Sequence, residues 1–181
     1  RARNAWSATA PMGTARHSFA AALLGGKLYA VGGEGQGGST LATVEAFDVQ
    51  AGTWAAVAPM SASREAPAVA AVGGRLYAIG GFKTAVLQSA EAFDPQTGAW
   101  ATVAPMAKGR FGARAAVLDG KIYVAGGYGG DYLNSMEIYD PGTNIWAAAA
   151  PMPTARAAFG MAAVGGKIYA AGGEGEDGSS L

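Results

Sequence analysis

The 181-residue sequence has no cysteine, a single histidine and no excess of charge of either sign. Without cysteine there is no disulfide framework, thiolate metal site or thiol catalysis, and one histidine alone cannot form an ordinary zinc or copper site. With 13 basic and 13 acidic side chains, the chain has no positive field to attract nucleic acid. No apolar run reaches the roughly 18 to 20 residues that cross a bilayer. We therefore expect no cofactor, metal, nucleic-acid or membrane partner, and the residues assign no compartment.

Glycine is abundant, with 29 residues, and it marks an internal repeat. Gly-Gly pairs and tryptophans both recur at steps of 48, 46 and 46 residues, and Pro-Met and Arg follow in the same register. The members are Gly32-Gly33, Gly80-Gly81, Gly126-Gly127 and Gly172-Gly173; Trp6, Trp54, Trp100 and Trp146; Pro11-Met12, Pro59-Met60, Pro105-Met106 and Pro151-Met152; and Arg16, Arg64, Arg110 and Arg156. Four features in one register predict a repeat architecture.

Each period predicts four short strands, most clearly in the third. Arg110–Leu118 and Lys121–Ala125 flank an Asp-Gly turn, which is a hairpin signal. Leu133–Tyr139 alternates like a strand, and Asn144–Ala149 gives a fourth strand before a proline. The run Ala147–Ala150 favours helix by propensity, but its register with the other periods favours strand.

A four-stranded unit of this size must stack on neighbours to bury both of its faces, and radial stacking gives a β-propeller. The expected fold is all-β: one domain over residues 1–181, with three complete blades at about 16–60, 64–106 and 110–152 and partial-blade strands at 4–12 and 156–181. We expect each tryptophan to pack between adjacent blades. The chain is predicted to be an open arc of a larger propeller or, alternatively, an engineered or self-associating partial ring whose open blade edges invite association.

These features resemble the kelch repeat. A tyrosine precedes the second glycine of each pair by four residues, at Tyr29, Tyr77, Tyr123 and Tyr169, and a Glu, an aromatic residue and the Trp follow. The segment 126–141 is most similar to the repeats of BTB-kelch adaptors, and bacterial kelch-repeat proteins are also similar. The resemblance covers the whole chain and implies the propeller fold. It is less specific for function, because kelch propellers include adaptors, sugar-processing enzymes and oxidases.

The resemblance to BTB-kelch adaptors also implies a set of binding residues. In those adaptors, arginines at the start of each first strand, with small polar residues two positions before the third-strand Glu, bind acidic peptides. The matching residues are Arg16, Arg64, Arg110 and Arg156, with Thr43, Ser89 and Ser135. A ring of guanidinium groups would suit carboxylates. The alternative is that each arginine hydrogen-bonds the backbone of its own blade.

The loops between second and third strands, Glu34–Thr40, Phe82–Val86 and Tyr128–Tyr132, vary while the strands repeat. Variable loops on a repeated scaffold are predicted to carry specificity. Tyr128 and Tyr132, together with Phe82 and Lys83, are the candidate contact residues.

Other polar residues are predicted to be structural. Glu45, Glu91 and Glu137 recur once per blade and are expected to accept backbone or Arg hydrogen bonds, and Asp48, Asp94 and Asp140 are expected to cap turns. The G-x-G-x-x-G spacings that begin at Gly33 and Gly173 lack the following helix of a dinucleotide site. Glu174, Glu176 and Asp177 lack the ligand spacing of a calcium loop. His17 and Ser18 are adjacent in an expected strand, where neighbours point to opposite faces, so no catalytic triad is expected.

The function predicted from these patterns is a non-catalytic scaffold that binds a protein or peptide, with an acidic partner as the leading hypothesis. The alternative from another class is a fragment of a carbohydrate-active enzyme similar to kelch sugar epimerases, for which Glu65 is the acid/base candidate. A third alternative is a partial or engineered propeller without a ligand.

Overall fold

The computed structural model describes residues 6–176 and 180–181, which contain fourteen β-strands of five residues each. They form three antiparallel four-stranded sheets and one two-stranded hairpin. The first sheet comprises β1 (Ala20–Leu24), β2 (Lys27–Val31), β3 (Val44–Asp48) and β4 (Thr53–Val57); the second β5 (Ala68–Val72), β6 (Arg75–Ile79), β7 (Ala90–Asp94) and β8 (Ala99–Val103); the third β9 (Arg114–Leu118), β10 (Lys121–Ala125), β11 (Met136–Asp140) and β12 (Ile145–Ala149); and the hairpin β13 (Gly160–Val164) and β14 (Lys167–Ala171). The all-β class and three complete blades are confirmed.

Tight turns join the strands within each blade. The first hairpin turns at Gly25 and Gly26, whose φ angles of 57° and 76° are those of a turn that matches the twist of an antiparallel pair. The turn between the third and fourth strands is capped by the predicted aspartates. Asp94 Oδ1, for example, accepts the backbone N–H of Gln96 at 2.9 Å. These short connections fix the register of each blade.

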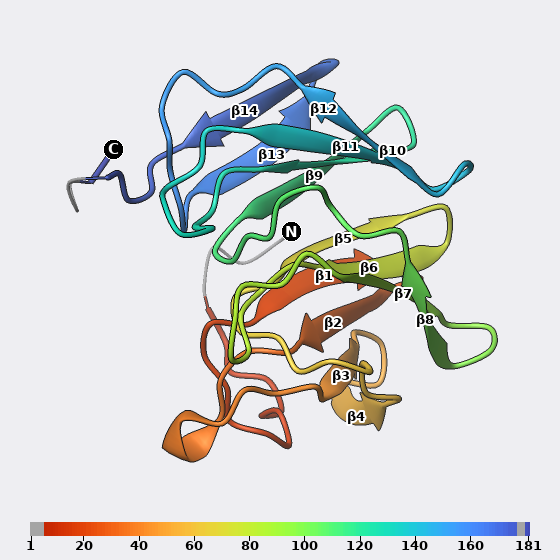
Figure 1. Cartoon of the computed structure of the whole chain (residues 1–181). Coiled ribbons are helices and arrows are strands. Elements are labelled where there is room, and N and C mark those ends of the chain that lie inside the picture. The colour runs from red at the N-terminus through yellow and green to blue at the C-terminus, as the bar shows by residue number, and fades with distance from the viewer. Residues whose placement is uncertain (1–5, 177–179) are drawn as a thin grey trace.

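The blades follow one another in chain order (Figure 1), with β1, β5, β9 and β13 as neighbouring inner strands. A line of backbone hydrogen bonds joins the segments just before these strands: Ala66 N–H donates to Ser18 O at 2.7 Å, Gly112 N–H to Ala66 O at 2.9 Å, and Ala158 N–H to Gly112 O at 2.9 Å. All four residues have positive φ. The same strained backbone conformation therefore recurs wherever one blade bonds to the next.

The core lies between blades. One buried cluster, which includes Leu76, Ala78 and Phe93, joins the first two sheets, and a second, which includes Ile122 and Tyr139, joins the second and third. Trp100 and Trp146 pack against these clusters, and each indole N–H donates to a carbonyl of the preceding blade's outer edge, Ala58 O at 2.9 Å and Ala104 O at 2.7 Å. The predicted packing of tryptophan between blades is confirmed at these two positions.

Two details differ from the sequence-based expectation. Residues 6–12, predicted to hold a strand of a preceding blade, contain no strand, and Trp6 is fully exposed. A β-strand needs a hydrogen-bonded neighbour, and the described residues offer none to this segment. The first strand of the third blade begins at Arg114 rather than Arg110, because residues 110–113 form the link to the neighbouring blade. In the part of the chain that the structure describes, no helix has the length and hydrophobicity of a membrane span.

Candidate functional site

The repeated arginine is buried inside its own blade. Arg64 Nη1 donates to the carbonyl oxygens of Gly80 and Ser89, both at 2.8 Å. Its Nη2 donates to Ser89 Oγ and to Glu91 Oε1, both at 2.9 Å. The Arg64 side chain has no exposed surface. A residue predicted to face a ligand is thus enclosed by backbone, hydroxyl and carboxylate acceptors.

The same four bonds recur in the other two complete blades. The acceptors are Gly126 O at 2.9 Å, Ser135 O at 3.0 Å, Ser135 Oγ at 3.2 Å and Glu137 Oε1 at 2.9 Å for Arg110, and Gly32 O at 2.7 Å, Thr43 O at 3.0 Å, Thr43 Oγ1 at 3.3 Å and Glu45 Oε1 at 2.7 Å for Arg16. The structure therefore brings the predicted arginines and hydroxyl residues together, one set per blade.

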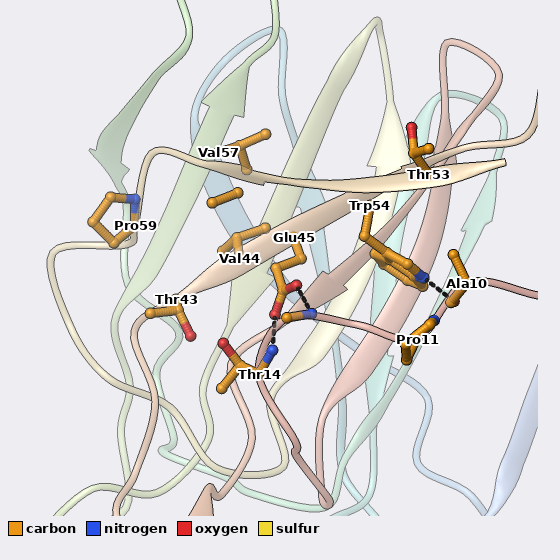
Figure 2. A pocket seen from close by; sticks show the side chains of 12 residues that line it. Ala10, Pro11, Thr14, Thr43, Val44, Glu45, Thr53, Trp54, Val57 and Pro59 are labelled. Carbon is orange, nitrogen blue, oxygen red and sulfur yellow. Dashed lines mark hydrogen bonds between the residues drawn. The ribbon is translucent and has the colours of Figure 1, made fainter. Parts of the chain in front are cut away.

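The repeated glutamate joins this arrangement to the segment that enters the blade. Glu91 accepts the backbone N–H groups of Ser61 at 2.7 Å and Ala62 at 3.2 Å, and Figure 2 shows Glu45 with the equivalent bond from Thr14. Burial acts to raise the pKa of Glu45 and Glu91, but these hydrogen bonds and those from arginine outweigh it and hold both pKa values below the ordinary 4.5. The predicted structural role of the glutamates is confirmed.

These contacts favour a structural role for Arg16, Arg64 and Arg110, and a direct bond from them to a partner stays a prediction. Arg156 differs. It is partly exposed and donates to Gly172 O at 2.7 Å, and no carboxylate within residues 6–176 and 180–181 pairs with it.

Residues that differ between the repeats lie together at the predicted loops between second and third strands. In each blade two isolated β-bridges extend the sheet beyond its strands and align three residues, one before the first strand and two at the ends of the second-to-third-strand loop. We call these triplets rim rows, and the face that they form the loop face. The rows are His17, Glu34 and Thr40; Glu65, Phe82 and Val86; Phe111, Tyr128 and Tyr132; and Ala157, Glu174 and Ser180.

Four aromatic rings form a continuous chain on the loop face. Phe82 lies 5.6 Å from Phe111 between ring centroids, Phe111 lies 5.6 Å from Tyr128, and Tyr128 lies 5.5 Å from Tyr132. Each ring is partly exposed. The chain crosses from the second blade to the third, and it unites the predicted contacts Tyr128, Tyr132 and Phe82 with Phe111. We call these four residues the aromatic chain.

Carboxylates flank the aromatic chain. Glu65 is the bridge partner of Phe82 in the second rim row, and Glu34 and Glu174 occupy the same position in the first and fourth rows that Tyr128 holds in the third. The exposed Lys83 and Lys108 lie near the loops, and Lys108 helps to line a groove of about 420 Å³ between the second and third blades. The loop face therefore combines aromatic surface with charges of both signs.

The side chains of His17 and Ser18 lie beside each other and do not point to opposite faces of a strand as predicted. Ser18 has φ 48° and precedes β1, so the alternation of a strand does not apply, and His17 Nδ1 lies 3.2 Å from Ser18 Oγ. Glu34 Oε1 is 3.8 Å from His17 Nε2, which exceeds a hydrogen bond, and the His17 side chain is 68% exposed. A catalytic base must be oriented by a hydrogen bond to a third group. This trio lacks that bond.

Two glycine-rich stretches and one acidic loop remain as candidate ligand sites, and the structure describes only the first of them completely. The first G-x-G-x-x-G stretch ends in a single 3₁₀ turn, Gln36–Gly38, and leads to β3 without an α-helix. The second ends at Gly178, and the acidic loop includes Asp177, both of which lie outside the described residues. Within the described ranges, no group of three or more acidic or histidine side chains could hold a metal ion. A pocket of about 620 Å³ (Figure 2) lies between the amino-terminal segment and the first blade.

Comparison with known proteins agrees with this architecture. Residues 2–173 match the KLHDC2/KLHL20/DRC7 Kelch-repeats domain. The solved structure of YjhT superposes with a TM-score of 0.80 at 21% sequence identity, covering 95% of this chain and 60% of that one. This chain thus spans less than two thirds of the length of that structure. No curated protein matches the sequence. With its repeats matched over nearly the whole sequence, the chain belongs to the kelch-repeat family.

Proposed function

We propose that this chain is a non-catalytic scaffold that binds a protein or peptide partner on its loop face, with the aromatic chain as the anchor. The observation that carries the proposal is the contiguity of Phe82, Phe111, Tyr128 and Tyr132 on variable positions of a repeated framework. Aromatic rings bury a large area at protein interfaces, and Tyr is enriched there because it also keeps a polar group in water. Kelch repeats are commonly protein-binding, and this chemistry fits that use.

The chemistry of the loop face favours a partner with an aromatic or aliphatic anchor and basic flanking residues. A Lys or Arg of the partner could stack on Tyr128 or Tyr132 and approach Glu34 or Glu65. Charge complementarity of this kind speeds association and sets orientation more than it adds affinity.

An acidic partner is the alternative. It rests on the repeated arginines, but three of the four guanidinium groups already have carboxylate partners inside their blades. Lys83 and Lys108 are the exposed basic groups near the loops that could attract an acidic segment.

A peptide selection tests the proposal without knowledge of the natural partner. A random-peptide phage library is selected on the immobilised chain, and the selected peptides are titrated by fluorescence anisotropy against the chain and its variants. We expect peptides with aromatic and basic residues, whose affinity falls at least about tenfold with Tyr128→Ala or Tyr132→Ala. Leu23→Ala is the matched control, because Leu23 is exposed at the far end of β1 and should leave binding unchanged.

Two results would contradict this assignment. If selected peptides bind both tyrosine variants as tightly as the original chain, the aromatic chain is not the anchor. If the selection instead enriches acidic peptides whose affinity falls with Lys83→Ala or Lys108→Ala, the acidic-partner alternative is supported.

A further inference from the structure

The junction between the first and second blades contains a pocket at the end of the strands that lies away from the loop face. Its volume is about 450 Å³, which is within the range of small-molecule sites. The first blade contributes residues of β2, β3 and β4, and the second contributes Phe93 at the end of β7 and Pro95 and Gly98 in the turn that follows. Both blades have all four strands. The pocket is therefore formed by two whole blades.

The two junctions between complete blades differ at one backbone group. Ala58 and Ala104 each follow the fourth strand of their blade, and each carbonyl accepts the indole N–H of the next blade's tryptophan. At the second junction, Ala104 N–H donates to Asn144 Oδ1 at 2.9 Å. At the first junction, none of the residues 6–176 and 180–181 accepts the Ala58 N–H. Ala58 is partly buried and lines the pocket, and a backbone N–H in such a place normally has an acceptor.

The difference arises from a single position in the turn between the third and fourth strands. Asn144 N–H donates to Asp140 O and Gly98 N–H donates to Asp94 O, both at 2.9 Å, so the two turns are equivalent. Their φ angles are 57° and 68°, a conformation that asparagine and glycine both adopt. A Cβ added at Gly98 would have no neighbouring atom within 4 Å. The first junction thus has space where the second has a carboxamide side chain.

Asn144 shows which chemical group this space accepts. Its Oδ1 is the acceptor for two donors, the Ala104 N–H and the Tyr139 hydroxyl at 2.7 Å. Phe93 stands in the place of Tyr139 and supplies an apolar ring instead of a hydroxyl. Its ring packs on Tyr29, 5.9 Å away between centroids, and both rings line the pocket. The pocket therefore combines one backbone donor with aromatic walls.

We propose that this pocket binds a small molecule that carries a primary carboxamide on an aromatic ring. The carboxamide oxygen accepts the Ala58 N–H, as Asn144 Oδ1 accepts that of Ala104. The ring of the ligand packs against Phe93 and Pro95, and the amide NH₂ donates to the oxygen atoms of Asp48 or Thr53, which line the same pocket. A ring is required because an amide group alone would fill only a small part of the volume.

Benzamide is the probe. It is titrated into the ¹⁵N-labelled 181-residue chain, and the backbone amides are followed by two-dimensional NMR. We expect saturable shifts of the Ala58 and Gly98 amides with a Kd of about 1–10 mM, as the small size of benzamide allows. The Ala104 amide is the internal control, because its N–H is already bonded to Asn144. Acetophenone, which has no N–H, and acetamide, which has no ring, should each bind at least about threefold more weakly.

A side chain placed in the pocket should replace the ligand. Gly98→Asn supplies the carboxamide from the chain itself, so it should abolish the benzamide response and raise the midpoint of thermal unfolding. Gly52→Asn is the matched control: Gly52 has the same turn position and the same φ of 68° in the first blade, an added Cβ has no atom within 4 Å, and it does not line this pocket. It should leave both benzamide binding and the midpoint unchanged. Asn144→Gly should make the Ala104 amide respond to benzamide.

Three results would overturn the proposal. They are benzamide shifts that do not include Ala58, benzamide binding that is unchanged by Gly98→Asn, and equal affinities for benzamide, acetophenone and acetamide. Equal thermal midpoints for Gly98→Asn and Gly52→Asn would also contradict it, because Ala58 N–H would then gain nothing from a carboxamide acceptor. The loop face lies at the other end of the strands, so none of these results bears on the binding of a peptide there.

Discussion

The guanidinium of Arg64 lies 2.9 Å from the carboxylate of Glu91, and neither side chain is more than 2% exposed. Glu91 also accepts two backbone N–H groups from the segment that connects the first two blades. The pair therefore joins β7 and the end of β6 to the connection between the first two blades. Removing one partner would leave a buried charge without compensation.

Glu91→Gln should lower the free energy of unfolding by about 3 kcal/mol, because the buried Arg64 would lose its counter-charge. The matched control is Arg75→Gln, which breaks the solvent-exposed pair with Asp94 at 3.3 Å and should change stability by less than about 1 kcal/mol. Urea unfolding followed by circular dichroism measures both. Similar effects for the two variants would contradict the structural role of the buried pair.

The lowered pKa values of Glu45 and Glu91 predict a loss of stability in acid. A carboxyl group whose pKa is lower in the folded than in the unfolded state contributes stability that is fully present above the unfolded value of 4.5 and is lost as pH falls through the folded value. The urea midpoint should therefore be constant near neutral pH and should fall below about pH 4.5. The partly exposed Asp48, Asp94 and Asp140 also have lowered pKa values. The Glu91→Gln variant therefore identifies how much of the loss of stability in acid comes from the buried Glu91. Its midpoint should fall less steeply with acid than that of the original chain, and an identical slope would contradict the prediction.

Much of the fold could be predicted from the sequence because the same pattern of residues occurs in every repeat. The spacing of Trp100 and Trp146 and of the Gly-Gly pairs predicts four-stranded units, and the loop Tyr128–Tyr132 is closed by a bridge at its predicted ends. Repetition identifies which residues are equivalent, and equivalence is enough to place strands, turns and the packed tryptophans.

The role of the repeated arginine could not be decided in the same way. A repeated Arg64 has the same spacing whether its guanidinium points toward a ligand or into the blade, and the choice depends on acceptors 16 to 27 residues away in sequence. The set of contact residues predicted from the sequence also lacks Phe111. Phe82 and Phe111 come from different blades, and only the inter-blade geometry brings them together. A signal was available: Phe111 directly follows a repeated arginine, and this position is His17, Glu65 and Ala157 in the other repeats.

Ala66→Gly should stabilise the chain by about 1 kcal/mol. Ala66 has φ 44°, a left-handed conformation that strains a residue with a Cβ, and its N–H bond to Ser18 would be kept. The matched reverse change is Gly112→Ala, at φ 64°, where an added Cβ finds its nearest neighbour at 3.6 Å and has room. The free energy of unfolding of Gly112→Ala should fall by a similar amount. Thermal unfolding measures the stability of both variants. Stabilisation by alanine at position 112 would contradict the strain argument.

Trp100→Ala should lower the free energy of unfolding by about 3 kcal/mol or more. The indole packs between the first two blades and its N–H donates to Ala58 O at 2.9 Å, so truncation opens a cavity and leaves a carbonyl without its donor. Trp6→Ala is the control, because Trp6 is fully exposed and should contribute little. Far-ultraviolet circular dichroism during urea unfolding avoids the change in tryptophan fluorescence that both variants cause. Equal stability of the two variants would mean that the inter-blade tryptophans do not hold the blades together, and the inter-blade core would then have to rest on residues such as Leu76 and Phe93 alone.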